Sequence, residues 1–393
     1  MNNIEIREQT DKYYLPVFGR YPLALTHGKG CMVYDADGEG YLDFLAGIAV
    51  NSLGYALVKA ISEQAGKIMH CSNVFYTDVQ ARAVKLISEA TGFDRVFLAN
   101  CGAEANEGAI KLARKYGHSK NDGKYRIITA VHSFHGRTMM TVTATGQPKY
   151  QQGYEPLPAG FDYVPYGDLE ALKEVMDEDV CCVMLEPIQG EGGVHVPSDE
   201  YLQGARALCD KYDALLIFDE IQSGVGRTGQ WFAYMHTGIK PDVLTFAKGI
   251  GGGFPTGGFC VDEKLAHVFK PGDHGGTFGG NALACAAIEA ALTTIKEEGL
   301  VEAAAEKGKY FMGKLQELKA KYPEKVTEVR GRGLILGMEL CKPGGAVVEH
   351  CLKDHVIVNC TAGNVIRLVP PLIVTEKEID TAVAALDAAL AEF

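Results

Sequence analysis

The sequence has 393 residues, of which 22% are charged and 47% hydrophobic, with a formal net charge of −12 and a pI near 5.4. This composition is typical of a globular enzyme with a large and a smaller domain, and the negative charge argues against nucleic acid or anionic membrane surfaces as partners. No apolar stretch approaches the roughly 18 residues that a transmembrane helix needs.

Two further features concern the compartment of the protein. The opening MNNIEIREQTDKYY lacks the apolar core of a signal peptide. The eleven cysteines are scattered and form no C-x-x-C pair, which argues against a zinc site or a disulfide framework. We therefore expect a cytoplasmic protein with reduced thiols and no metal.

Short apolar runs alternate with helical patterns along the middle of the chain. In chain order, the expected elements are strand 96–100, helix 103–116, strand 126–131, strand 181–187, helix 199–211, strand 214–220 and strand 242–248. Strands that alternate with helices indicate parallel βαβ units, in a sheet covered on both faces. The sequence therefore predicts an α/β fold.

Polar residues follow the apolar runs at the points where ligands of such sheets collect, beyond the carboxyl ends of the strands. These segments are CGAEANEG (101–108), HSFHGRT (132–138), IQGEGG (188–193), the end of ALLIFDE with Gln222, and Lys248. A cap or a turn explains any one polar strand end. Five that converge on one rim indicate a site.

The segment CGAEANEG leads directly into a predicted helix. Gly102 permits a tight turn, and the first helical turn then offers unpaired N–H groups and a positive dipole end to an anion. An ordinary helix start, with Glu104 and Glu107 complementing the dipole, explains the same residues. The segment is neither a Walker A loop nor a G-x-G-x-x-G fingerprint.

Asp219 and Lys248 both stand where an apolar strand ends, so each charge needs a partner or water. A structural salt bridge is one explanation for Asp219. A carboxylate there would also keep a pyridine nitrogen protonated, and a desolvated lysine can lose its proton and attack an aldehyde. An anion site, an aspartate and such a lysine are the parts that pyridoxal phosphate requires.

Long motifs carry a resemblance to a known family over almost the whole chain. They are YLDFLAGIAVNSLG (41–54), NCGAEANEGAIKLARKY (100–116), FHGRT (134–138), LEPIQGEGG (185–193), FDEIQSGVGRTG (218–229), FAKGIGGGFPTGG (246–258), HGGTFGGN (274–281) and VIRLVPPL (365–372). The sequence resembles the class III, fold-type I pyridoxal-phosphate aminotransferases. The resemblance implies a large domain with a mostly parallel seven-stranded sheet between helices and a smaller α+β domain. It places an N-terminal segment that packs with the small domain at 1–55, the large domain at 56–295 and the small domain at 296–393.

The resemblance also implies the residues that hold pyridoxal 5′-phosphate. Lys248 would bind the cofactor covalently and move the proton, Asp219 would pair with the pyridine nitrogen, and Gln222 would lie near the ring hydroxyl. The remaining implied contacts are Gly102 and Ala103 on the phosphate, Phe134 on the ring, and Thr277 on the phosphate of the neighbouring subunit in a homodimer with shared active sites.

Two arginines and one glutamate are implied to bind the substrates, because arginine holds a carboxylate with a planar fork. Arg137 would bind the α-carboxylate of a donor whose distal amino group reacts. Arg367 would bind the α-carboxylate of glutamate or 2-oxoglutarate. Glu191 would pair with Arg367 in the first half-reaction and move away in the second.

The sequence departs from the family pattern at four places. Cys101 stands where serine is usual, Gly276 replaces serine or threonine, and Tyr166-Gly167 stands where Phe-Asn is common. The stretch GYALVKAI (54–61) is about three residues shorter than the usual segment. None of these changes touches Lys248 or Asp219.

The stretch LAGIAVNSLG is most like family members that act on N2-acetyl-L-ornithine. The implied reaction passes its δ-amino group to 2-oxoglutarate, giving N-acetylglutamate 5-semialdehyde and L-glutamate, as in arginine biosynthesis. Another ω-aminotransferase acting on N-succinylornithine, N-succinyl-diaminopimelate, ornithine or 4-aminobutyrate is an alternative. An aminomutase or decarboxylase on the same scaffold and a non-catalytic binding protein are two others.

Overall fold

The computed structural model describes residues 1–54 and 57–393. The segment after Gly54 that the sequence predicts to be shortened includes residues 55–56, and it therefore lies partly outside the described residues. Across the described ranges, no helix is both long and apolar enough to span a bilayer.

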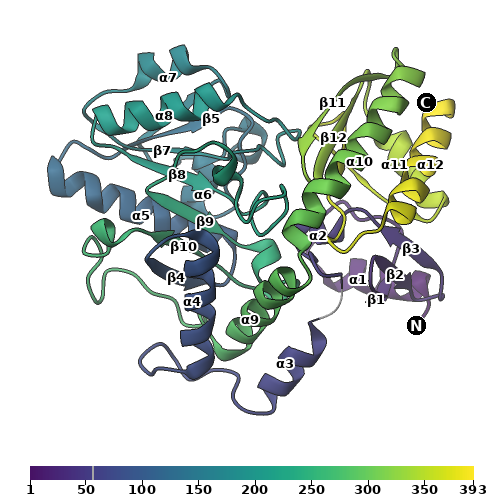
Figure 1. The fold of residues 1–393 in the computed structure, drawn as a ribbon, viewed down its shortest axis with the longest axis horizontal. Helices are drawn as coiled ribbons and strands as arrows, with labels where there is room; N and C mark the ends of the chain where they lie inside the picture. Colours follow the sequence, from purple (N-terminus) through teal and green to yellow (C-terminus); the bar gives the residue numbers. More distant parts are fainter. Residues whose placement is uncertain (55–56) are drawn as a thin grey trace.

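The larger part of the molecule is built on a seven-stranded sheet (Figure 1). In spatial order its strands are β4 (Arg95–Ala99), β10 (Gly257–Val261), β9 (Val243–Phe246), β8 (Leu215–Asp219), β7 (Val180–Leu185), β5 (Arg126–Ala130) and β6 (Phe161–Val164). β10 is antiparallel to both its neighbours, and the other pairs are parallel. The predicted α/β fold with a mostly parallel seven-stranded sheet is confirmed.

Both faces of this sheet are buried, because successive side chains of a strand point to opposite faces. In β8, Leu215 and Ile217 join the apolar cluster beneath α5, whereas Leu216 and Phe218 join the main core on the other side. The helices of this part are α4 (Asp78–Thr91), α5 (Gly102–Lys120), α6 (Met139–Ala144), α7 (Leu169–Val175), α8 (Asp199–Lys211) and α9 (Ala282–Glu297). Because α5 packs on β7, β9 and β10, it runs across the middle of the sheet and brings its first turn to the strand ends.

A second, smaller part contains an antiparallel sheet and three helices. Its strands in spatial order are β11 (Val326–Arg332), β12 (Ile335–Leu340), β15 (Val365–Leu368) and β14 (Asn359–Thr361), and its helices are α10 (Leu300–Lys321), α11 (Gly345–Lys353) and α12 (Glu376–Glu392). α10 packs on β11 and on α12, which buries the apolar face of each helix.

The N-terminal segment joins this smaller part by strand pairing. The third sheet has the order β1 (Leu25–Lys29), β2 (Met32–Asp35), β3 (Gly40–Asp43) and β13 (Val356–Ile357), with β3 and β13 parallel. Figure 1 shows these N-terminal strands, in purple, beside the green and yellow C-terminal elements. The other helices are α1 (Asn3–Tyr13), α2 (Ala46–Ala49), α3 (Val58–Ala65) and the short 3₁₀ turns η1 (Pro148–Tyr150), η2 (Ala233–His236), η3 (Lys248–Ile250) and η4 (Glu263–Leu265).

Candidate active site

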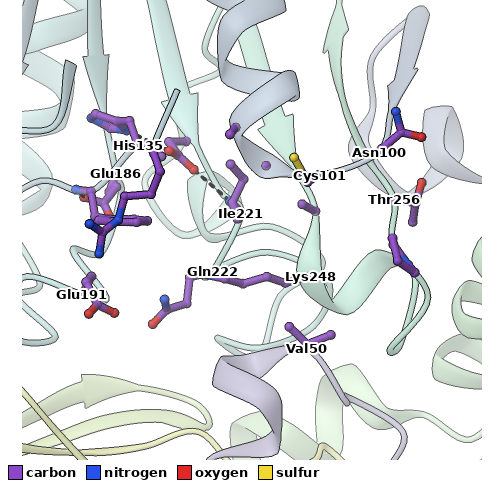
Figure 2. A pocket seen from close by; sticks show the side chains of 18 of the residues that line it. Val50, Asn100, Cys101, His135, Glu186, Glu191, Ile221, Gln222, Lys248 and Thr256 are labelled. Atoms are coloured by element: carbon purple, nitrogen blue, oxygen red, sulfur yellow. Dashed lines mark hydrogen bonds and ion pairs between the residues drawn. The ribbon is translucent and has the colours of Figure 1, made fainter. Parts of the chain in front are cut away.

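A cavity of about 480 Å³ opens beyond the carboxyl ends of the parallel strands. The strand ends that the sequence singled out all contribute to its wall, through Cys101 and Gly102, Phe134, Glu191, Asp219 and Lys248. Figure 2 shows His135 and Glu186 on one side of the cavity, Cys101 and Thr256 on the other, and Lys248 between them. The cavity therefore brings together residues from five connections of the sheet.

The first turn of α5 forms one wall. Its N-cap residue is Cys101, whose side chain makes no capping hydrogen bond, and Gly102 and Ala103 line the cavity. A Cβ on Gly102 would lie 2.8 Å from Cδ1 of Ile221, so a larger residue there would have to displace the Ile221 side chain. The first N–H groups of the helix thus remain available to an anion.

Lys248 begins the turn η3, two residues after β9 ends. Its backbone φ is +49°, a left-handed conformation that costs energy for a side chain other than glycine. The pKa of the Lys248 amine is lowered from 10.5 to about 8, mainly by burial and also by the nearby charge of Arg367, while the charges of Asp219 and Glu191 act in the opposite direction. The amine can therefore lose its proton near neutral pH.

Asp219 ends β8 and is held by three hydrogen bonds. Its Oδ2 accepts from Nδ2 of Asn106 at 2.8 Å and bonds Nδ1 of His135 at 2.8 Å, while its Oδ1 accepts from the N–H of Ile221 at 3.1 Å. The carboxylate is buried in the cavity wall and keeps a lone pair of Oδ1 for a further partner. It can thus bind a cationic N–H that enters from the cavity.

Buried acid and base groups surround Asp219. Burial lowers the pKa of His135, but its hydrogen bond to Asp219 and the charges of Asp219 and Glu186 outweigh burial, so the net shift is upward. Burial raises the pKa of Glu186 to about 8, although the positive charge of His135 opposes this shift. The Oε2 of Glu186 accepts the backbone N–H of Phe134 at 3.0 Å, which ties the Phe134 loop to the neighbouring strand end.

Arg367 lies in the middle of β15, and its side chain is fully buried. Its Nη1 donates to Oε2 of Glu191 at 2.8 Å and to Oε1 of Gln222 at 3.2 Å, and its Nε donates to Oδ1 of Asn359 at 3.2 Å. Among the described residues, Nη2 has no partner. Burial raises the pKa of Glu191, but the charge and hydrogen bond of Arg367 lower it more. The structure thus neutralises a buried guanidinium with a carboxylate that also lines the cavity.

The remaining predicted residues have different surroundings. Phe134 and Arg137 line the same cavity as Lys248. Thr277 does not; it is exposed, in the stretch 275–278. Within the described ranges, a Cβ on Gly276 would meet nothing within 4 Å, so packing does not require glycine rather than serine or threonine there. At the other departure, the hydroxyl of Tyr166 donates to the carbonyl of Glu186 at 2.6 Å, which a phenylalanine could not do.

Sequence reasoning missed three residues of this site, namely Asn106, His135 and Glu186. Two of them had a local signal, since His135 stands in FHGRT and Glu186 directly follows β7. Asn106 had none, because an asparagine on an amphipathic helix reads as an exposed polar residue. It is instead completely buried, and its amide also donates to the carbonyl of His135 at 2.7 Å.

Comparison with known proteins identifies the family. The family model described as aminotransferase class III matches residues 16–390. The chain belongs to the class III aminotransferases. It is therefore a pyridoxal-phosphate-dependent transaminase of the fold-type I class, and the cofactor and fold that the sequence motifs implied are confirmed.

Individual relatives of this aminotransferase cover almost its whole length. The acetylornithine aminotransferase of Caldanaerobacter subterraneus subsp. tengcongensis is 52% identical over 386 residues, covering 97% of this chain and 98% of the relative. That of Methanocaldococcus jannaschii is 49% identical and covers 97% and 96%. Among solved structures, acetylornithine aminotransferase from Elizabethkingia anophelis has a TM-score of 0.90 at 34% identity, with both chains fully covered. Ornithine aminotransferase from Toxoplasma gondii has a TM-score of 0.96 at 33% identity and covers 100% of this chain and 96% of that one.

The cavity of this aminotransferase fits its cofactor. The uncapped start of α5 suits a phosphate, the free lone pair of Asp219 suits a protonated pyridine nitrogen, and the lowered pKa of Lys248 suits attack on an aldehyde. These three features come from separate elements, and together they match the chemical groups of pyridoxal phosphate.

Proposed function

We propose that the protein transfers the δ-amino group of N2-acetyl-L-ornithine to 2-oxoglutarate, giving N-acetylglutamate 5-semialdehyde and L-glutamate, a reaction of arginine biosynthesis. One observation carries the proposal: the cavity of Lys248 holds Arg137 and Glu191 in its wall, and Glu191 neutralises the charge of the buried Arg367. The carboxylate site at Arg137 is therefore accessible, whereas Glu191 blocks the carboxylate site at Arg367.

The named relatives support this choice of donor. The relatives with 44–52% identity over nearly the full chain are acetylornithine aminotransferases. Ornithine aminotransferases with a similar structure favour free ornithine as the second candidate, at 31–33% identity. The higher identity of the first group favours the acetylated substrate.

The chain's own residues have separate tasks in this reaction. Pyridoxal phosphate, when bound, supplies an aldehyde and an electron-withdrawing ring. Lys248 would hold it covalently and, once the amine of the donor has displaced the lysine, would carry a proton from the donor carbon to C4′ of the cofactor, which its lowered pKa permits. Asp219 keeps the ring nitrogen protonated, with Asn106 and His135 holding the carboxylate in place. Phe134 would stack on the ring, Gln222 would lie near its hydroxyl, and Gly102 and Ala103 would bind the phosphate, since all four line the cavity.

The two arginines separate the two half-reactions. In the first, Arg137 binds the α-carboxylate of the donor, while Glu191 keeps Arg367 occupied and so directs the distal amine to the reacting position. In the second, Glu191 moves away, and Arg367 binds the α-carboxylate of 2-oxoglutarate. The side chain of Glu191 is 27% exposed, whereas that of Arg367 is fully buried, so the glutamate is the partner with room to move.

We further propose a cytoplasmic homodimer in which Thr277 of each subunit completes the phosphate site of the other. Exposed apolar side chains support an interface near Thr277, because Phe278 and the nearby Val74, Phe75 and Tyr76 are all strongly exposed. The rings of His70 and Phe278 lie 5.3 Å apart, so the two segments form one surface. Burial of that surface in a dimer would explain its composition.

The pairing of β3 with β13 supports the proposed division into the segment 1–55, the large domain 56–295 and the small domain 296–393.

A comparison of amino donors tests the substrate. With 2-oxoglutarate as acceptor, kcat/KM is measured for N2-acetylornithine, N-succinylornithine, ornithine, 4-aminobutyrate and N-succinyl-diaminopimelate. We expect the highest value for N2-acetylornithine; a strong preference for ornithine or 4-aminobutyrate would refute the proposal.

Two further tests concern the alternative functions. An absolute requirement for 2-oxoglutarate excludes an aminomutase or decarboxylase. Borohydride reduction that fixes the cofactor on Lys248 excludes a non-catalytic binding protein.

A further inference from the structure

The guanidinium of Arg137 lies against an aromatic ring that no motif singled out. In the described part of the chain, Arg137 makes no ion pair or hydrogen bond, but its Cζ lies 4.0 Å from the ring centroid of Tyr150 and 5.6 Å from that of Phe134. The rings of Tyr150 and Phe134 are 5.7 Å apart and nearly perpendicular, at 81°. Two aromatic rings therefore orient the guanidinium of Arg137, and among the described residues no carboxylate does so.

The main chain around Tyr150 is held firmly to the segment that carries Arg137. Tyr150 ends the turn η1, and its N–H donates to the carbonyl of Gln147 at 3.0 Å. The side-chain amide of Gln147 donates to the carbonyl of Ser133 at 3.0 Å, and that of Gln151 donates to the carbonyl of Thr145 at 2.9 Å. Residues on both sides of the ring thus anchor it to the loops around α6.

Stacking on a ring leaves the edge of a guanidinium free. The attraction between the cation and the ring acts through the face of the guanidinium, whereas a carboxylate binds in its plane through two N–H groups. The two interactions are therefore compatible at one arginine. A long arginine side chain that is already ordered loses less conformational entropy when the carboxylate arrives.

We propose that Tyr150 is a positioning residue that holds the guanidinium of Arg137 ready for the carboxylate of the amino donor. This inference rests on the proposed role of Arg137. The effect of Tyr150 through Arg137 is limited to donors that carry the carboxylate, whereas an effect through its contact with Phe134 would change both kinds of donor alike.

The experiment compares two donors that differ only in that group. N-acetyl-1,4-diaminobutane is N2-acetylornithine without its carboxylate. For each holoenzyme variant, the carboxylate preference is the kcat/KM of N2-acetylornithine divided by that of N-acetyl-1,4-diaminobutane. Since both values come from one sample, the amount of folded, active enzyme cancels. The variants are Tyr150→Leu, Tyr150→Phe, Arg137→Leu and, as a matched control, Tyr154→Leu, which removes an exposed tyrosine from the same connection.

We expect Tyr150→Leu to reduce the carboxylate preference about 3- to 20-fold, the range for a cation–ring contact at a partly exposed site. Tyr150→Phe keeps the ring and should stay within about twofold of the wild type, as should Tyr154→Leu. Arg137→Leu should reduce the preference about 100-fold, because it removes charged hydrogen bonds. An unchanged preference in Tyr150→Leu, with a loss in Arg137→Leu, would overturn the role of Tyr150 and leave the proposed function standing. An unchanged preference in Arg137→Leu would overturn both.

Discussion

The ion pair between Glu191 and Arg367 makes the sharpest prediction about catalysis. Substituting Glu191→Gln keeps the shape of the side chain but removes the charge that neutralises a fully buried guanidinium, across a contact of 2.8 Å. The α-carboxylate of glutamate, a dicarboxylate, then no longer has to displace a negatively charged Glu191 from Arg367. The single carboxylate of N2-acetylornithine can also be drawn to Arg367, where the molecule lies in an unproductive orientation.

The magnitude follows from the strength of this contact. A hydrogen bond to a charged group contributes about 1.5 to 3 kcal/mol. Because the Glu191 side chain is 27% exposed, solvent screening favours the lower end, about 1.5 to 2 kcal/mol. Since about 1.4 kcal/mol corresponds to a factor of ten, the kcat/KM of glutamate relative to N2-acetylornithine should rise about 10- to 30-fold.

The assay measures the two donor half-reactions separately, with each donor alone mixed with the holoenzyme and the cofactor absorbance followed in a stopped-flow instrument. Glu289→Gln is a matched control, because Glu289 is 31% exposed and pairs with Arg82 at 2.7 Å outside the cavity. An unchanged ratio in Glu191→Gln would refute the proposed switch, and an equal rise in Glu289→Gln would show that the effect is not specific to the site.

Three other predictions concern pH and stability. In the apoprotein, the rate at which Lys248 reacts with an aldehyde probe should rise as pH increases through about 8 and then level off, since the neutral amine attacks; an inflection near 10.5 would contradict this. In urea unfolding, Gly117→Ala should lower the free energy of unfolding by about 3 kcal/mol or more, because the new Cβ would lie 2.0 Å from the carbonyl of Lys124 in the structure. Gly313→Ala, in open space within α10, should raise it by about 0.5 to 1 kcal/mol, and equal effects of the two alanines would refute the packing argument. Asn106→Ala should cost about 2 kcal/mol in the same assay, because it removes a hydrogen bond to a buried carboxylate; a loss below about 0.5 kcal/mol would contradict this.

The sheet and the position of its cavity could be predicted because their signals are local. The apolar runs that became β5, β7, β8 and β9 are short and bounded by polar or turn residues, and parallel strands bring their carboxyl ends to one edge. The polar residues after those runs therefore had to meet. The expected strand at 242–248 is shorter in the structure, since β9 ends at Phe246 and Lys248 starts the turn η3.

The contacts within the site could not be predicted in the same way, because they join segments far apart in the chain. Asn106 reaches Asp219 across 113 positions only because α5 packs over β8. Glu191 meets Arg367 across 176 positions only because the smaller sheet lies against the strand ends of the larger one. The ring that orients Arg137 belongs to a turn with no motif of its own.

The sequence by itself determined the fold class, the cofactor and the residues with reactive side chains, because short-range patterns and family motifs carry that information. Only the tertiary structure decided which charges are neutralised, which pKa values move and in which direction, and which guanidinium remains open to a substrate. Burial and the distance between charges set those properties, and both depend on how the two sheets and their helices pack together.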